Sequence, residues 1–341
     1  MATRMYCCPN CFSDHFLKQK IVDFPDNHGT CDFCNLEDTP LLIPNRFGDN
    51  LDSLVDLYLV SQDGQSLTNL IQKDWRVFNF DDSDIIDKLF KSIVEDHSFE
   101  DLCYRPKFVK DRTVIEHWEI FREELKHQNR FFPSTAPNQE HLSSFTDYIA
   151  STILSKSQSF FRARIDISNK GIPVENMGKP PKDRVGNGRA NPIGIPYLYL
   201  ASSIKTAISE IRGHKGEQIT IAEYELGENL SLADLRNPID KISPFIIEEK
   251  ALEFIYQNMP FLMFLGKELS KPIIPREANL EYLPTQYLCE MIKGLNFDGI
   301  IFRSSVSEGD NYVLFSDNKL NIIKTFQYEI TDTNIKSKEV M

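Results

Sequence analysis

Apolar residues in the segment 47–157 recur every three or four positions, which is the period of an amphipathic helix. The clearest series run over Leu51–Tyr58, Ile85–Ile93 and Val114–Leu125. Asp84 is placed to cap a helix over Ile85–Val94, and a loop at Pro133–Pro137 precedes a helix expected over His141–Leu154. The segment is therefore predicted to be a small bundle of about four to six helices.

From residue 158 onward the pattern changes to short runs of β-branched and aromatic residues, which favour strands. We expect strands at Phe160–Ile165, Gln218–Tyr224, Gly299–Arg303, Tyr312–Phe315 and Ile322–Tyr328. Helices are expected at Ser203–Arg212, at Ile246–Leu269 with an interruption near Pro260, and at Thr285–Lys293. This segment is predicted to be α+β.

The first 46 residues are rich in turns and contain five of the seven cysteines. Two C-x2-C pairs, Cys8 with Cys11 and Cys31 with Cys34, are separated by nineteen residues. This spacing is typical of a tetrahedral zinc site with four thiolate ligands, which can hold together a segment too short to bury a core unaided. We therefore predict a structural zinc knuckle. The weaker candidates for ligands are Cys7, as an alternative to Cys8, and His15 and His28.

The patterns predict a multi-domain α+β protein in three parts and a tail. The parts are a zinc knuckle over 1–46, a helical domain over 47–157, an α+β domain over 158–330 and a flexible tail over 331–341.

The 341 residues carry a net charge of −12. Such a chain repels nucleic acid and anionic membranes, so neither is an expected partner and any anion site must be a local basic pocket. The N-terminus has no apolar segment of signal-peptide length, and the hydrophobic run Pro260–Leu265 is too short to span a bilayer. We expect a cytoplasmic location.

One candidate nucleotide site lies in the α+β part. The glycine-rich loop Gly186–Gly194 contains Arg189 and is followed by an aromatic run with Tyr199 and by the helix that carries Glu210. Glycines let a backbone approach a phosphate, tyrosines can stack on a ring, and a carboxylate can hold a ribose. Upstream, strand alternation places Arg162 and Arg164 on one face, which suits the border of an anion cleft or, as the alternative, a solvated edge strand.

Three blocks within residues 158–328 resemble the RES family, which is named for an arginine, a glutamate and a serine. The first block is Phe-Arg-Ala-Arg at 161–164. The second is Gly-Arg-Ala-Asn-Pro-Ile-Gly-Ile-Pro-Tyr-Leu-Tyr-Leu-Ala-Ser at 188–202 with Ala207 and Glu210, and the third is Asp-Gly-Ile-Ile-Phe-Arg-Ser-Ser at 298–305 with Asn-Tyr-Val-Leu-Phe at 311–315. Characterised members of the family are NAD-degrading toxins whose fold is related to that of ADP-ribosyltransferases. The chain departs from the family pattern at Ala190, where an aromatic residue is common.

The resemblance implies that Arg162, Glu210 and Ser304 are the catalytic residues. The residues that it implies in substrate binding are Arg164, Arg189, Asn191, Tyr199 and Ser305, the last also being the family serine if the alignment shifts by one. A carboxylate can stabilise the oxocarbenium-like state formed when the nicotinamide–ribose bond breaks, and arginine forks suit a pyrophosphate.

The function expected from this resemblance is an NAD glycohydrolase that acts as a toxin or defence effector. ADP-ribosyl transfer at the same site and a non-catalytic sensor are the alternatives. A toxic enzyme needs an antitoxin, an autoinhibitory contact or a trigger, and the N-terminal half is a candidate for that role; the oligomeric state stays open.

The arrangement of a zinc knuckle and helices before the RES part is also similar to a RES subgroup with HEPN-like N-terminal domains. Two Arg-x4-His patterns, Arg112 to His117 and Arg122 to His127, match the spacing by which HEPN nucleases position a phosphodiester. Their acidic neighbours disfavour RNA, so we interpret the pattern as a solvated helix face with partial packing, with an RNase as the weaker alternative.

Overall fold

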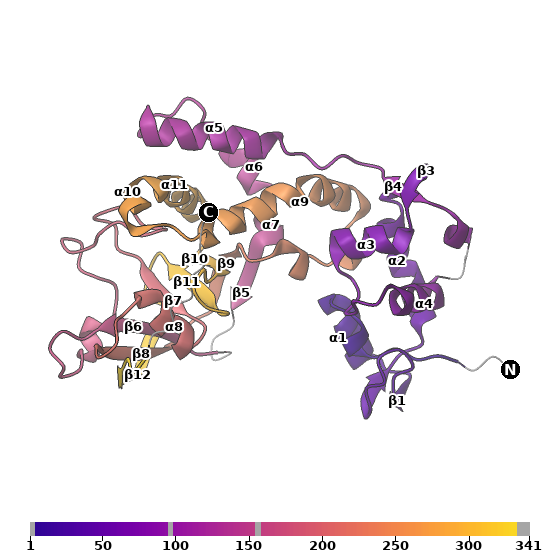
Figure 1. Ribbon diagram of the computed structural model, residues 1–341, viewed down its shortest axis with the longest axis horizontal. Coiled ribbons are helices and arrows are strands. Elements are labelled where there is room, and N and C mark those ends of the chain that lie inside the picture. Colours follow the sequence, from indigo (N-terminus) through magenta and orange to yellow (C-terminus); the bar gives the residue numbers. More distant parts are fainter. Residues whose placement is uncertain (1–3, 95–97, 154–157, 333–341) are drawn as a thin grey trace, which may run out of the picture. The chain divides into compact units, whose positions relative to one another are not determined.

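The computed structural model describes residues 4–94, 98–153 and 158–332, and the chain divides into two compact units (Figure 1). The first unit comprises Met1–Arg112 and Asn237–Phe261, and the second comprises Thr113–Arg236 and Leu262–Met341. Each unit is therefore assembled from two separate stretches of chain. The domain boundaries predicted at residues 46 and 157 remain predictions. The two compact units divide the chain at other positions, after Arg112, Arg236 and Phe261. Most of the expected tail, 333–341, lies outside the described residues.

Helices and two small sheets make up the first unit. The helices are α1 (His15–Asp23), α2 (Gly48–Val55), α3 (Leu67–Trp75), α4 (Ser83–Ile93) and the beginning of α9 (Glu249–Ser270). The strands are β1 (Asn27–Gly29) with β2 (Thr39–Leu41), and β3 (Tyr58–Gln65) with β4 (Tyr104–Pro106), each pair antiparallel.

Two expectations for the helical part were wrong in detail. The helical series was expected to reach Tyr58, but α2 ends at Val55 and Tyr58 begins β3, because Tyr58–Val60 is a run of strand-favouring residues that pairs with β4. The cap of α4 is Asp82 and not Asp84: the Asp82 side chain accepts a hydrogen bond from the backbone N–H of Asp84 at 2.9 Å.

An eight-stranded mixed sheet forms the second unit, with the strand order β12-β8-β6-β7-β11-β10-β9-β5. The strands are β5 (Ala150–Ile153), β6 (Phe160–Ile165), β7 (Leu198–Ala201), β8 (Gln218–Leu226), β9 (Leu230–Asp234), β10 (Gly299–Arg303), β11 (Asp310–Leu314) and β12 (Leu320–Glu329). Neighbouring strands are antiparallel except β9 and β10, which are parallel. All five predicted strands are present, and the α+β fold class is confirmed.

The helices of the second unit connect or flank the strands. They are α5 (Thr113–His127), α6 (Gln139–Ser143), α7 (Thr146–Ile149), α8 (Ile204–Ile211), the end of α9, α10 (Ala278–Glu281) and α11 (Leu283–Gly294).

Two further expectations were corrected here. The helix expected over His141–Leu154 is replaced by α6 and α7, followed by β5, because Ala150–Ile153 pairs with β9 at the sheet edge; Leu154 lies outside the described residues. The interruption expected near Pro260 does not occur, since α9 continues through it. Burial of the neighbouring Met259 and Phe261 offsets the hydrogen bond that a proline cannot donate.

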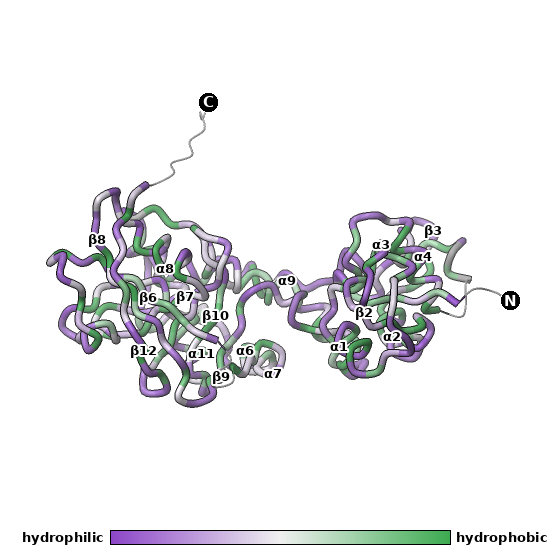
Figure 2. Tube along the Cα trace, turned by 90° about the horizontal axis from the view of Figure 1, so that it is seen from below, coloured by the Kyte–Doolittle hydropathy of each residue, from purple (hydrophilic) through white to green (hydrophobic). Residues whose placement is uncertain are grey.

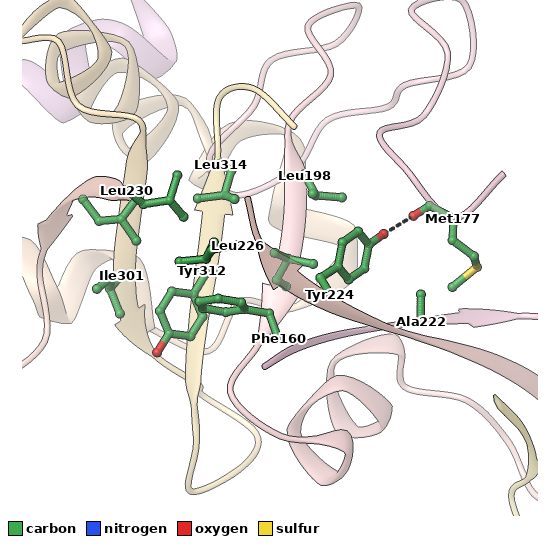
Figure 3. Packing of buried hydrophobic residues seen from close by; sticks show 12 residues of the cluster. Phe160, Met177, Leu198, Ala222, Tyr224, Leu226, Leu230, Ile301, Tyr312 and Leu314 are labelled. Atoms are coloured by element: carbon green, nitrogen blue, oxygen red, sulfur yellow. Dashed lines mark hydrogen bonds between the residues drawn. The ribbon is translucent and has the colours of Figure 1, made fainter. Parts of the chain in front are cut away.

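Two apolar clusters lie on opposite faces of the large sheet. On one face Phe160, Leu200, Tyr224 and Tyr312 belong to a cluster drawn in Figure 3, in which the Tyr224 hydroxyl donates to the Met177 carbonyl at 2.5 Å. On the other face α8 packs beside β6 and β7 and contributes Ala207 to a cluster with Ala163, Ala201, Ile219 and Ile221. Because side chains alternate along a strand, the sheet buries residues on both faces, and α8 is fixed on one of them.

Hydrophobic residues occur in short stretches in both units (Figure 2). Among the described residues, no helix combines the length and apolarity that a membrane crossing requires.

Candidate functional site

A cleft of about 540 Å³ in the second unit has a floor formed by one row of residues across four neighbouring strands. Phe161 of β6 pairs with Ala201 of β7, and Ala201 pairs on its other side with Asn311 of β11. Asn311 in turn pairs with Phe302 of β10. All four residues line the cleft. The strand order thus joins the three RES-like sequence blocks at one place.

Glu210 lies on α8 above this floor and is held through a single carboxylate oxygen. Its Oε1 accepts hydrogen bonds from the Ser304 hydroxyl at 2.6 Å and from the Asn311 amide at 2.7 Å. In the described part of the chain Oε2 has no hydrogen-bond partner. The carboxylate is therefore oriented by the protein while one oxygen stays available to a ligand in the cleft.

Ser304 is oriented by its own turn. Its hydroxyl oxygen accepts from the backbone N–H groups of Val306 and Ser307 at 3.2 and 3.1 Å. A serine hydroxyl has one proton, and with its lone pairs engaged that proton is directed to Glu210. Ser304 acts on the carboxylate, whereas the adjacent Ser305 lines the cleft.

Arg162 is a half-buried cation without a protein partner in the described residues. Its Nε and Nη1 are buried and make no hydrogen bond in the described structure. Burial, and then the nearby charge of Arg164, lower the pKa of Arg162. Strands β6 and β7 are paired only at Phe161 and Ala201. The residues that follow this pair, Arg162 on β6 and Leu200 on β7, both line the cleft. A buried donor left unpaired is destabilising unless a ligand supplies the acceptor, and here the acceptor must be anionic.

The loop Gly186–Gly194 is held in a fixed shape by Asn191 and Tyr199. The Asn191 amide donates to the carbonyls of Gly186 and Pro192, and the Tyr199 hydroxyl donates to Asn191 Oδ1 at 2.7 Å. A Cβ at position 188 would lie 2.2 Å from Asn191 Oδ1, so only glycine fits there. Burial raises the pKa of Tyr199, whose ring lines the cleft while its hydroxyl is occupied by the loop.

Helix α11 fastens the same loop from the other side. The buried Gln286 amide donates to the carbonyls of Gly188 and Asn191 at 2.9 and 3.0 Å, and the Thr285 hydroxyl donates to the Arg189 carbonyl at 2.6 Å. The sequence analysis missed Thr285 and Gln286, and it placed Asn311 in the third RES-like block without selecting it as a site residue. Only one feature of the sequence pointed to Gln286: it is a polar residue within the apolar stripe of a helix. Its partners could not be identified from the sequence, because they lie more than ninety positions away.

Arg189 is half-buried at the cleft wall. Its Nη1 donates to the Lys271 carbonyl at 2.7 Å, and its guanidinium lies 5.8 Å from the centre of the Tyr282 ring. Burial lowers the pKa of Arg189. Tyr282, a cleft-lining aromatic residue that the sequence analysis did not select, thus keeps this arginine stacked against the wall.

The structure brings most of the predicted site residues together. Those that line the cleft are Arg162, Arg189, Tyr199, Glu210 and Ser305. Ser304 and Asn191 stand behind lining residues and hold them. Arg164 does not line the cleft, and its guanidinium donates to the Asn176 carbonyl instead.

The four predicted zinc ligands converge in the first unit. The Sγ atoms of Cys8, Cys11, Cys31 and Cys34 all lie within 4.8 Å of one another, and three of the pairs are separated by 3.3–3.8 Å. A tetrahedral zinc ion with Zn–S bonds of about 2.3 Å needs sulfur atoms about 3.8 Å apart, so the donor set fits zinc. Two of the alternatives are engaged elsewhere: the Cys7 thiol donates to the Leu42 carbonyl at 3.3 Å, and His28 lies 3.4 Å from Asp38. The third, His15, does not belong to the cluster of donor atoms.

The Arg-x4-His patterns lie on and next to α5 and do not form a cleft with each other in the described structure. Arg122 is paired with Glu281 at 2.7 Å and with Glu268 at 3.6 Å, and His127 lies 3.9 Å from Glu123. Arg112 and His117 are exposed. Arg122 therefore fastens α5 within the second unit, which agrees with a structural interpretation of the pattern.

Comparisons with known proteins identify a family and a distant structural neighbour. Residues 164–330 match the model of the RES domain, a range that begins just after Arg162. One chain in the crystal structure of the M. tuberculosis MbcT–MbcA toxin–antitoxin complex is 12% identical with a TM-score of 0.33, over 55% of this chain and 92% of that chain. A search of curated proteins finds no match.

Proposed function

We propose that the chain is an NAD glycohydrolase, because residues 164–330 match the model of the RES domain. It hydrolyses the nicotinamide–ribose bond of NAD and releases nicotinamide and ADP-ribose. The observation that carries the proposal is that an unpaired half-buried arginine, Arg162, and an oriented carboxylate, Glu210, line one cleft. The cleft volume of about 540 Å³ falls within the range of small-molecule sites.

The residue types suit this reaction. Breaking the bond leaves positive charge on the ribose, and the available oxygen of Glu210 stabilises that charge and hydrogen-bonds a ribose hydroxyl. Arg162 and Arg189 bind the pyrophosphate, and Tyr199 packs against a ring. Nicotinamide leaves as a neutral molecule, so no strong general acid is needed. Water supplies the hydroxyl group at the ribose carbon, and its other proton goes to solvent.

Product analysis tests the proposal. The purified full-length chain is incubated with NAD carrying a label in its ADP-ribose part, and the products are separated by chromatography. We expect free nicotinamide and free labelled ADP-ribose in equal amounts. Label attached to protein or nucleic acid in an added lysate would instead assign ADP-ribosyl transfer to the same site. Unchanged NAD under all conditions would refute both activities.

We propose in addition that loss of NAD makes the chain toxic and that an antitoxin restrains it. The resemblance to NAD-degrading RES toxins supports this proposal. The RNase alternative has no supporting contact in the described residues, where Arg122 is already paired with glutamates.

For the first unit we propose that Cys8, Cys11, Cys31 and Cys34 hold a structural zinc ion. Four thiolates fill all positions of a tetrahedral site, so the ion stabilises the knuckle and offers no open position for catalysis.

We expect about one zinc ion per purified chain, measured by elemental analysis. Cys31→Ser removes a ligand and is expected to abolish the zinc content and unfold the knuckle, which increased proteolysis near the N-terminus reports. Cys103→Ser is the matched control, because Cys103 is exposed and lies outside the cluster. Full zinc content in Cys31→Ser would contradict the assignment.

A further inference from the structure

Arg212 ends helix α8 in an unfavourable backbone conformation. Its φ of 49° and ψ of 40° lie in the left-handed region, which glycine usually occupies at the end of a helix. Arg212 follows Glu210 by two positions, is exposed, and lines the cleft. Left-handed geometry at a residue with a Cβ is costly and recurs at functional sites.

The Arg212 side chain has no partner within the described residues. It makes neither a hydrogen bond nor an ion pair there, in contrast to Arg236 or Arg303, which are bound to Asp310. The fold therefore does not account for an arginine at this position.

The charged residues that line the cleft are Arg162, Arg189, Arg212 and Glu210. Three guanidinium groups and one carboxylate make the lining net positive, on a chain whose net charge is −12. Burial lowers the pKa of Arg189, the Glu210 carboxylate raises it, and the charge of Arg212 lowers it. All three side chains line the same cleft. Three cations beside a single carboxylate leave the cleft with excess positive charge, which favours a ligand with more than one negative charge.

We propose that Arg212 is a substrate-binding residue whose exposed guanidinium binds the pyrophosphate of the dinucleotide in the cleft, together with Arg162. This inference rests on the proposed function, because it takes the pyrophosphate of NAD as the ligand. An arginine fork supplies paired donors to a phosphate, and an exposed fork makes that contact sensitive to salt.

The chain contains a matched control for the test. Arg76 ends α3 with φ 48° and ψ 48°, is likewise exposed, belongs to the first unit and does not line the cleft. It differs from Arg212 in one contact, because its guanidinium lies 3.8 Å from the Asp240 carboxylate. Arg212→Gly and Arg76→Gly therefore remove the same side chain from the same backbone geometry. Each substitution relieves the left-handed conformation and is expected to raise the melting temperature of its unit by about 1–3 °C.

Only Arg212→Gly is expected to weaken substrate binding. We expect its KM for NAD and its Kd for ADP-ribose, measured by calorimetry, to rise about threefold to tenfold, with a smaller effect on kcat. Raising the salt concentration is expected to increase the KM of the wild type more steeply than that of Arg212→Gly. Arg76→Gly is expected to match the wild type in all three measurements.

Equal Kd, KM and salt dependence in Arg212→Gly and the wild type would overturn the inference. The ADP-ribose measurement separates it from the proposed function: a wild type that binds ADP-ribose but does not cleave NAD refutes only the glycohydrolase activity. A wild type that binds no ADP-ribose refutes both.

Discussion

Glu210→Gln is expected to reduce kcat/KM for NAD by about 100-fold or more, the loss seen when one preorganised electrostatic group is removed from a transition state. The glutamine oxygen can still accept from Ser304 and Asn311, so the side chain keeps its position and loses only its charge. Because Glu210 is exposed, the free energy of unfolding is expected to change by less than about 0.5 kcal/mol. Initial rates of nicotinamide release and urea denaturation measure the two quantities.

Glu225→Gln is the control for this prediction. Glu225 is an exposed glutamate on β8 in the same unit and does not line the cleft. It is expected to retain wild-type activity. Wild-type activity in Glu210→Gln and Glu210→Ala would remove the carboxylate from the reaction.

Arg162→Met is expected to reduce activity and stabilise the fold at the same time. Loss of two charge-assisted hydrogen bonds to the pyrophosphate, each worth about 1.5–3 kcal/mol, is expected to lower kcat/KM by about 100-fold or more. In the free protein the same substitution removes buried donors that have no partner, so the free energy of unfolding is expected to rise by about 1–3 kcal/mol. Nicotinamide release and urea denaturation test the two opposite changes.

Arg164→Met is the matched control, two positions along the same strand. Its guanidinium is bonded to the Asn176 carbonyl and does not line the cleft. We expect this variant to keep most of its activity and to gain no stability. If Arg164→Met, and not Arg162→Met, lost activity, the assignment of the family arginine would move to Arg164.

Local patterns predicted the elements that local interactions stabilise. The strand Phe160–Ile165 was predicted with its observed bounds, and α8 agrees within one residue at each end, because alternation and capping are properties of neighbouring residues. The two C-x2-C pairs predicted a cluster of thiols that the structure confirms. The prediction failed where pairing overrode a helical pattern, as at Ala150–Ile153, whose partner β9 begins almost eighty positions later.

The sequence by itself determined which residue types could carry the chemistry: the RES-like blocks, Glu210, the arginines and the four cysteines. Tertiary structure alone decided which of them meet. Only the fold shows that Arg162 lines the cleft and Arg164 does not. It also shows that Ser304 binds Glu210, whereas Ser305 lines the cleft. Asn311, Gln286 and Arg212 join the site for the same reason. The physical reason is that the cleft is a row of registered residues across β6, β7, β11 and β10, strands that are neighbours in the sheet but not all in the sequence. Residue spacing predicts contacts between residues that are near each other in the sequence. Hydrogen bonds between a helix and distant strands depend instead on the order of the strands in the sheet.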